Sequence, residues 1–79
     1  MWYVYMLRCV DDSLYTGIAL DVDARVARHN QGKGARYTRS RLPVRVVYCE
    51  PCLSHSAALS REMAVKGLSR AEKEALLKP

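Results

Sequence analysis

The sequence predicts an α+β fold, in which a three-stranded, largely antiparallel sheet is flanked by helices in the order β-β-α-β-α-α. Three observations predict it. Two short segments rich in aromatic and β-branched residues flank a turn, a third such segment follows a basic loop, and helix signals lie between and after them. A chain of 79 residues can bury one thin core, so residues 1–79 are expected to form a single domain.

The first two strands are expected to form a hairpin. Residues 3–9 and 14–19 have strand character, and the polar run 11–13 between them predicts a loop of three to four residues. A helix follows, because apolar residues recur at helical spacing after residue 21. The candidate N-cap of this helix is Asp21 or Asp23. The helix is expected to end at Gly32 and Gly34.

The second half of the chain predicts one more strand and two more helices. Residues 31–43 are polar and basic and are expected to form a loop, after which residues 44–49 form a strand closed by Pro51. Helical spacing extends from residue 54 to 66, before Gly67. Ser69 and Glu72 have the spacing of a capping box, which starts a last short helix to about residue 77. The box gives Glu72 a structural role.

The positive charge of the chain is concentrated in one stretch. Thirteen Lys and Arg residues against eight Asp and Glu give a net charge of +5, and no acidic residue lies between Asp23 and Glu50. Seven cations in that stretch favour a polyanion such as a nucleic-acid backbone as the partner. The alternative is a solvated basic face that keeps the protein soluble. The seven cations are Arg25, Arg28, Lys33, Arg36, Arg39, Arg41 and Arg45.

The cysteines and the start of the chain predict a cytoplasmic protein without a membrane partner. Three cysteines, an odd number, argue against a disulfide framework and fit a reducing compartment. We expect no secretory leader, and the sequence has no apolar run long enough to span a bilayer. The least favoured interpretation is a zinc-stabilised interaction protein. Its zinc ligands would be Cys49, Cys52 and His55, with Cys9 as a fourth, but a single CxxC motif is a weak signal for zinc.

Three observations single out candidate catalytic residues. Tyr5 and Tyr15 lie on the two strands of the predicted hairpin, so their hydroxyl groups can come near one another. Arg25 and His29 are four residues apart and share one face of a helix. Glu62 lies close to the apolar stripe of the second long helix, where a carboxylate must be paired, protonated or bound to a cation. The alternatives are core tyrosines, a structural histidine, and an ion pair between Glu62 and the lysine four residues further on.

Together these residues resemble the GIY-YIG nuclease superfamily. Its two half-motifs are matched by residues 3–5 (YVY) and 15–17 (YTG), and its helix-borne Arg and His and its metal-binding Glu are matched by Arg25, His29 and Glu62. The run HNQGKGARY is similar to the small, single-domain bacterial branch, the YhbQ-like or UPF0213 group. The resemblance covers about residues 2–77. The chain departs from the family in the Tyr that replaces the first Gly and in having no Asn after position 30.

The resemblance implies an endonuclease that hydrolyses DNA phosphodiester bonds in repair or processing with Mg²⁺ or Mn²⁺. It assigns Glu62 to the metal and Arg25 to the scissile phosphate. Tyr5 is implied as the general base, with His29 beside it to take or share the proton, and Tyr15 as a residue that places the water or the phosphate. A tyrosine base has an unperturbed pKa near 10, and a nearby Arg and a divalent cation are expected to favour its anion.

Residues around the catalytic set are expected to contact nucleic acid. The absence of a side chain at Gly17 is expected to let the backbone and the substrate approach each other. The others are Arg28, Lys33, Arg36, Tyr37, Arg39 and Arg41. The expected partner is DNA, with single-stranded and branched forms included, and the protein is expected as a monomer or weak homodimer. The alternative function is a catalytically weak or inactive nucleic-acid-binding module that uses the same basic face.

Overall fold

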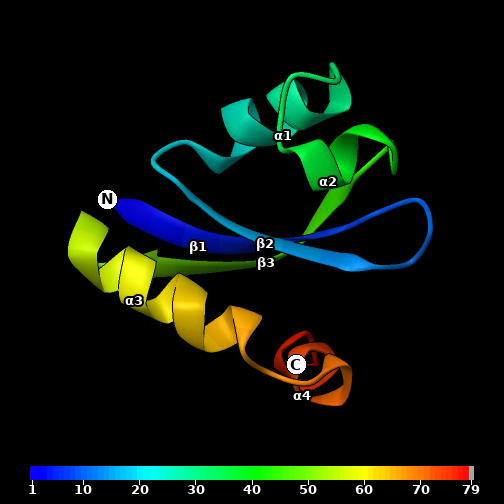
Figure 1. The fold of residues 1–79 in the computed structure, drawn as a ribbon. Coiled ribbons are helices and arrows are strands. Elements are labelled where there is room, and N and C mark those ends of the chain that lie inside the picture. The colour runs from blue at the N-terminus through cyan, green and yellow to red at the C-terminus, as the bar shows by residue number, and fades with distance from the viewer. Residues whose placement is uncertain (79) are drawn as a thin grey trace.

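The structure, a computed structural model, describes residues 1–78 and confirms the predicted α+β class (Figure 1). The three strands form one antiparallel sheet in the order β2-β1-β3. The elements are β1 (Trp2–Arg8), β2 (Leu14–Ala19), α1 (Val22–Asn30), α2 (Arg36–Arg39), β3 (Arg45–Cys52), α3 (His55–Lys66) and α4 (Arg70–Leu76). Among the described residues, no helix has both the length and the apolar character needed to cross a membrane.

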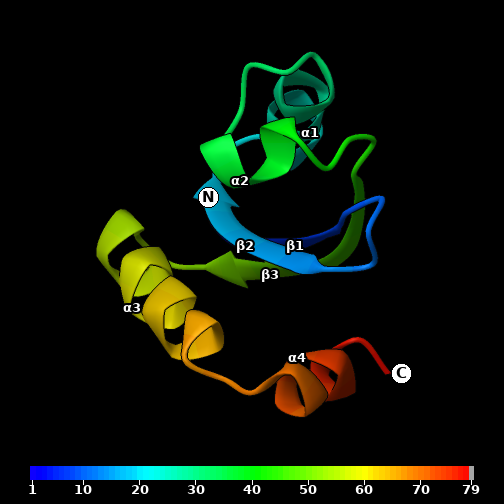
Figure 2. The ribbon, with the colours of Figure 1, turned by 45° about the vertical axis from the view of Figure 1, so that its right-hand side comes forward.

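Helices cover both faces of the sheet. Helices α1 and α2 lie on one face, and α3 and α4 lie on the other, as both views of the ribbon show (Figures 1 and 2). Side chains alternate along a strand, so the central strand β1 contributes to two cores. Tyr5 and Leu7 point towards α1 and α2, whereas Val4 and Met6 point towards α3 and α4. The four side chains from Val4 to Leu7 are therefore all buried.

The helix ends follow the sequence signals. The Asp21 side chain is the N-cap of α1 and accepts a hydrogen bond from the amide of Ala24 at 3.0 Å. The chain leaves α1 at Gly32, whose φ of +77° favours glycine. At the start of α4, Ser69 and Glu72 form the predicted capping box, with bonds of 2.9 and 3.1 Å.

Three features of the fold differ most from the prediction. The hairpin loop has five residues, 9–13, because β1 ends at Arg8. Strand β3 does not close at Pro51 but continues to Cys52, since β3 is an edge strand, where proline is tolerated. The predicted basic loop contains one helical turn, α2, which has no side-chain cap and buries Thr38 completely. This turn is held by contacts with the rest of the molecule and not by a local signal.

Candidate active site

The predicted residues of the first three elements meet on the α1 side of the sheet. Tyr5 on β1 pairs with Gly17 on β2, and its ring crosses the neighbouring strand at that glycine. A Cβ atom on Gly17 would lie 2.7 Å from the hydroxyl oxygen of Tyr5 and 2.8 Å from its Cζ. Glycine is therefore required here to admit the Tyr5 ring. Its role as a contact for nucleic acid stays a prediction.

A buried chain of hydrogen-bonding groups leads from Tyr5 into the protein. The Tyr5 hydroxyl lies 3.1 Å from Nε2 of His29, and Nδ1 of His29 lies 2.8 Å from Oγ1 of Thr38. The Thr38 hydroxyl donates to the carbonyl of Ala35 at 2.9 Å. Tyr5, His29 and Thr38 are each at most 1% exposed. Gly34 completes the enclosure, since a Cβ there would lie 2.2 Å from Nδ1 of His29.

Aromatic rings continue from His29 to the surface. The Tyr15 ring packs edge-on against His29, with centroids 5.4 Å apart, and stacks with Tyr37 at 6.1 Å. The guanidinium of Arg41 lies 3.9 Å over the Tyr37 ring. Arg41 also donates to the carboxylate of Asp11 at 3.0 Å and to the carbonyl of Tyr37 at 2.8 Å. The Arg41 charge is thus already paired within the protein, and its contact with nucleic acid stays a prediction.

A pocket of about 440 Å³ opens beside His29. Three cations reach it, and none of its lining residues is acidic, so it is suited to an anion such as a phosphate. The structure thereby brings together residues that the sequence assigned to catalysis and to nucleic-acid binding. The lining residues are Tyr15, Arg25, Arg28, His29, Lys33, Gly34 and Ala35.

The charge state of the site follows from burial. The pKa of Tyr5 is raised to about 12, mainly by burial and then by Tyr15 and the Glu62 carboxylate, while the Arg25 guanidinium acts in the opposite direction. Burial, and then Arg25, lower the pKa of His29. At neutral pH Tyr5 is therefore a phenol and His29 an uncharged imidazole. Arg25 favours the Tyr5 anion as expected, but the effect of burial is larger.

Glu62 lies on α3, which covers the other face of the sheet (Figure 1). Its side chain is 17% exposed and forms the i,i+4 ion pair with Lys66, at 3.3 Å. Its negative charge is the smallest of the causes that raise or lower the pKa of Tyr5. In the described residues no group of three or more His, Cys, Asp or Glu side chains forms a metal cage. One partly exposed carboxylate fits a hard ion such as Mg²⁺, which keeps several waters and uses one or two carboxylates with substrate phosphates.

The residues of the alternative zinc site do not converge. Cys49 and Cys52 are three residues apart on β3, and positions three apart on a strand point to opposite faces. Cys49 is exposed, whereas Cys52 is buried in the core on the α3 side. Cys9 belongs to the core on the other face, and the His55 ring packs against Trp2 with centroids 4.4 Å apart.

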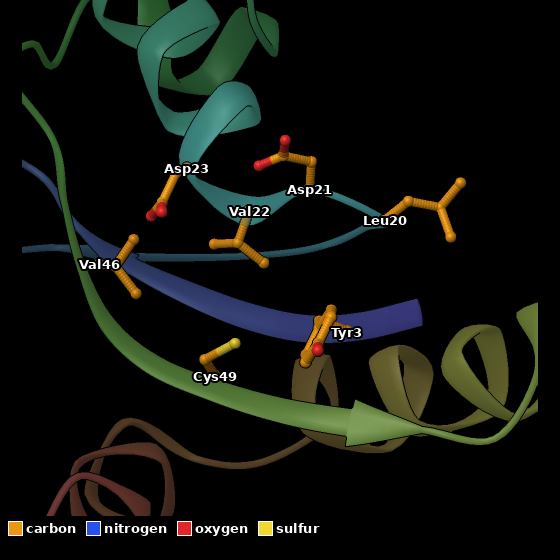
Figure 3. A pocket seen from close by; sticks show the side chains of 7 residues that line it. All are labelled: Tyr3, Leu20, Asp21, Val22, Asp23, Val46 and Cys49. Atoms are coloured by element: carbon orange, nitrogen blue, oxygen red, sulfur yellow. The ribbon is translucent and has the colours of Figure 1, made fainter. Parts of the chain in front are cut away.

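A second pocket, of about 420 Å³, lies between the start of α1 and β3 (Figure 3). Asp21 and Asp23 lie at its α1 side, and Tyr3 and Cys49 come from the sheet. None of the predicted catalytic or nucleic-acid-binding residues lines it. The two pockets share no lining residue, and the charge of this one is opposite to that of the pocket beside His29.

Sequence reasoning missed three residues that build the site. Gly34 is predicted as a helix stop, and its missing side chain also makes room for His29. Asn30 fixes the end of α1 to the start of β3, through bonds of 2.8 and 3.0 Å with the backbone of Val44. Thr38 contacts His29 from α2. The glycine-rich run after His29 is a sequence signal for close packing. No feature of a single sequence indicates that Thr38 contacts His29.

Comparison with known proteins gives a consistent family. The sequence profile of the GIY-YIG catalytic domain matches residues 1–75. A UPF0213 protein of Natronomonas pharaonis is 53% identical over 75 residues, 95% of this chain and 88% of that protein. A UPF0213 protein of Staphylococcus haemolyticus is 52% identical over 71 residues, 90% of this chain and 87% of that protein.

Two solved structures are similar over most of the chain. The solution NMR structure of a UPF0213 protein from Bacillus halodurans is 49% identical, with a TM-score of 0.62, and covers 98% of this chain and 83% of its own. The solution NMR structure of a protein from E. faecalis is 39% identical, with a TM-score of 0.63, and covers 95% of this chain and 80% of its own.

Proposed function

Because this chain belongs to the GIY-YIG catalytic-domain family, a superfamily of nucleases, we propose that it is an endonuclease that hydrolyses DNA phosphodiester bonds. One observation carries the proposal. His29, which lies within hydrogen-bond distance of buried Tyr5, lines a pocket that three cations and no acidic residue also line. Such a pocket attracts a phosphate to a position beside His29, whose imidazole can accept and release a proton.

The reaction needs a proton acceptor for the attacking water. A standing phenolate of Tyr5 is costly, because ionising a group of pKa about 12 at pH 7 requires about 7 kcal/mol. Tyr5 therefore acts as a relay: its hydroxyl proton passes to Nε2 of His29 while its oxygen takes a proton from the water. The water oxygen forms a bond to phosphorus, the bond to the leaving sugar oxygen breaks, and that oxygen takes a proton from solvent.

The remaining residues bind and orient the phosphate. Arg25 lines the pocket and stabilises the negative charge that develops on the phosphate. Tyr15, packed on His29 at the pocket wall, places the water or the phosphate. Glu62 would hold Mg²⁺ or Mn²⁺, with water and the phosphate as the other ligands. When bound, the ion supplies Lewis-acid stabilisation of the phosphate charge.

We infer the cellular setting from composition. The three unpaired cysteines fit a reducing, cytoplasmic location. The exposed cations fit a role in DNA repair or processing, with single-stranded and branched DNA among the substrates. One domain with one site nicks one strand per encounter, so a monomer or weak homodimer is sufficient.

A cleavage assay tests the proposed activity and its metal. Purified protein with Mg²⁺ or Mn²⁺ is expected to cut at least one of single-stranded, duplex, flapped and branched DNA, and to be inactive in chelator. Glu62→Ala and Tyr5→Phe are each expected to lower the rate by about 100-fold or more, since each removes a group that acts on the reacting atoms. Asp23→Asn, at the other pocket, serves as a matched carboxylate control. Wild-type rates in Glu62→Ala would contradict the metal role.

A second candidate function is a nucleic-acid-binding module without cleavage. It is favoured by the ion pair between Glu62 and Lys66, which already neutralises the carboxylate that a metal would need. In that case no cut would appear at any metal concentration, and Tyr5→Phe would leave DNA affinity unchanged.

A further inference from the structure

The hydrogen bonds around His29 determine which ring nitrogen carries the proton. A carbonyl oxygen can only accept a hydrogen bond. The Thr38 hydroxyl therefore donates its single proton to the carbonyl of Ala35. Towards Nδ1 of His29, 2.8 Å away, the same hydroxyl oxygen must then accept. Nδ1 therefore carries a hydrogen, and in a neutral imidazole Nε2 is left with a free lone pair.

We propose that Thr38 is a positioning residue, which holds neutral His29 in its Nδ1-protonated tautomer so that Nε2 accepts the proton of Tyr5. The proposal rests on the proposed function for its catalytic meaning, because Tyr5 and His29 form the proton relay there. The tautomer itself is a property of the resting protein and can be tested without a substrate.

The packing around His29 and Thr38 excludes other hydrogen-bond partners and other orientations of the imidazole ring. Thr38 is 0% exposed and His29 is 1% exposed, so water does not replace the threonine hydroxyl. The backbone of Gly34 lies against the Nδ1 edge of the ring, where even a Cβ atom would be 2.2 Å away. A half-turn of the ring would put carbon atoms in place of both nitrogens and break both hydrogen bonds. The ring orientation is therefore fixed, and the position of its proton depends on Thr38.

The other tautomer would disable the relay. With the hydrogen on Nε2, His29 would donate to the oxygen of Tyr5, and that proton would block the path by which the tyrosine proton leaves. Nδ1 would then face the threonine as an acceptor, and the single hydroxyl proton could not serve both Nδ1 and Ala35. If the hydroxyl turned to Nδ1, its bond of 2.9 Å to the Ala35 carbonyl would be lost, and that carbonyl would keep only the backbone amides of Thr38 and Arg39.

Nitrogen NMR of the histidine side chains tests the tautomer directly. In wild-type protein and in Thr38→Ser, which keeps the hydroxyl, the ¹⁵N shifts of His29 are expected to show a protonated Nδ1 and an unprotonated Nε2. In Thr38→Val, which has nearly the same shape without the hydroxyl, the pattern is expected to change to the Nε2-protonated form or a mixture. Exposed His55, the other histidine of the chain, is the internal control. An unchanged His29 pattern in Thr38→Val would overturn the proposal.

Cleavage kinetics test the catalytic meaning. Thr38→Val is expected to lower the cleavage rate at saturating DNA by about 10–100-fold with unchanged DNA affinity, while Thr38→Ser stays within about threefold of wild type. Amide spectra and thermal unfolding confirm that each variant is folded. A normal rate in Thr38→Val with a changed tautomer would overturn the positioning role. If wild-type protein cuts no nucleic acid, the proposed function fails, and the nitrogen shifts still decide whether Thr38 sets the tautomer.

Discussion

At the residue scale, two glycines determine the shape of the site. Gly17 leaves room for the Tyr5 ring to cross β2, and Gly34 leaves room for the edge of the His29 ring. Both positions are filled by a side chain from elsewhere in the chain, so neither glycine is present for backbone freedom. A side chain at either position would displace one member of the proposed proton relay, Tyr5 or His29.

Gly17→Ala tests this packing. The added Cβ would lie 2.7 Å from the Tyr5 hydroxyl oxygen, so the ring must shift. We expect a loss of about 1–3 kcal/mol in the free energy of unfolding, and a fall in cleavage rate of about 100-fold, because a displacement near 1 Å is enough to misplace a catalytic group. Urea unfolding and the DNA cleavage assay measure the two effects.

The matched control is Gly67→Ala. A Cβ there meets only the carbonyl oxygens of Met63 and Ala64, at 3.5 and 3.6 Å, which are ordinary contacts. Cleavage by this variant should equal that of wild type. If Gly17→Ala also cleaves at the wild-type rate, the position of the Tyr5 ring does not matter for the reaction.

At the element scale, α4 is attached to the hairpin turn by charged groups. Arg8 donates two hydrogen bonds of 2.8 Å to the Glu74 carboxylate, and Arg70 donates one of 3.0 Å to the same group. Arg70 also donates to the carbonyl of Asp12 at 2.8 Å. These bonds, with Arg8 as the largest cause, lower the pKa of Glu74 to about 2.

The attachment of α4 should therefore weaken in acid. Because the pKa of Glu74 is lower in the folded protein than its ordinary value of 4.5, its stabilising contribution is complete above that pH and is lost as the pH falls towards 2. In Glu74→Gln we expect faster amide exchange in α4 at pH 7, with α3 as the internal reference. The thermal midpoint of this variant should also change less than that of wild type between pH 4.5 and 2. Equal exchange in α4 of the two proteins would contradict the attachment.

At the scale of the whole molecule, the sheet separates two kinds of cation. On the α3 and α4 side and at the hairpin turn, arginines such as Arg8, Arg61 and Arg70 form ion pairs. On the α1 and α2 side, among the residues that the structure describes, most cations have no ion pair; Arg41, bound to Asp11, is the exception. A polyanion that binds by charge therefore meets the α1 and α2 side. Among the described residues, the cations of this side without an ion pair are Arg25, Arg28, Lys33, Arg36 and Arg39, whereas Arg45 pairs with Arg8 across the sheet and lies on the α4 side.

The salt dependence of DNA binding measures this asymmetry. Each cation that contacts a phosphate contributes about 0.7–0.9 to the slope of log affinity against log salt concentration. Arg36→Ala and Arg39→Ala, two exposed positions on α2, are each expected to reduce the slope by about that amount. Arg61→Ala, whose guanidinium is bound to Glu50 on the other side of the sheet, should leave the slope unchanged. An equal loss in all three variants would indicate that no particular face is used.

Local signals in the sequence were sufficient for the strands, the longer helices and the position of the positive charge. Alternating residues set the faces of β1 and β2, the Asp21 and Ser69 caps set two helix starts, and the acid-free stretch predicted which side is basic. Each of these signals acts between residues close in the chain or is a matter of composition. A single sequence contains all of the information they need.

Only the tertiary structure decided how the site is assembled. The bond between Tyr5 and His29 joins residues 24 apart in the chain, that between His29 and Thr38 joins residues nine apart, and the Arg41 pair with Asp11 joins residues 30 apart. Such contacts depend on how the layers pack, which no local pattern encodes. The sequence thus predicted most residues of the candidate site, and packing decides that Nε2 of His29 faces Tyr5 and that Arg41 is paired with Asp11.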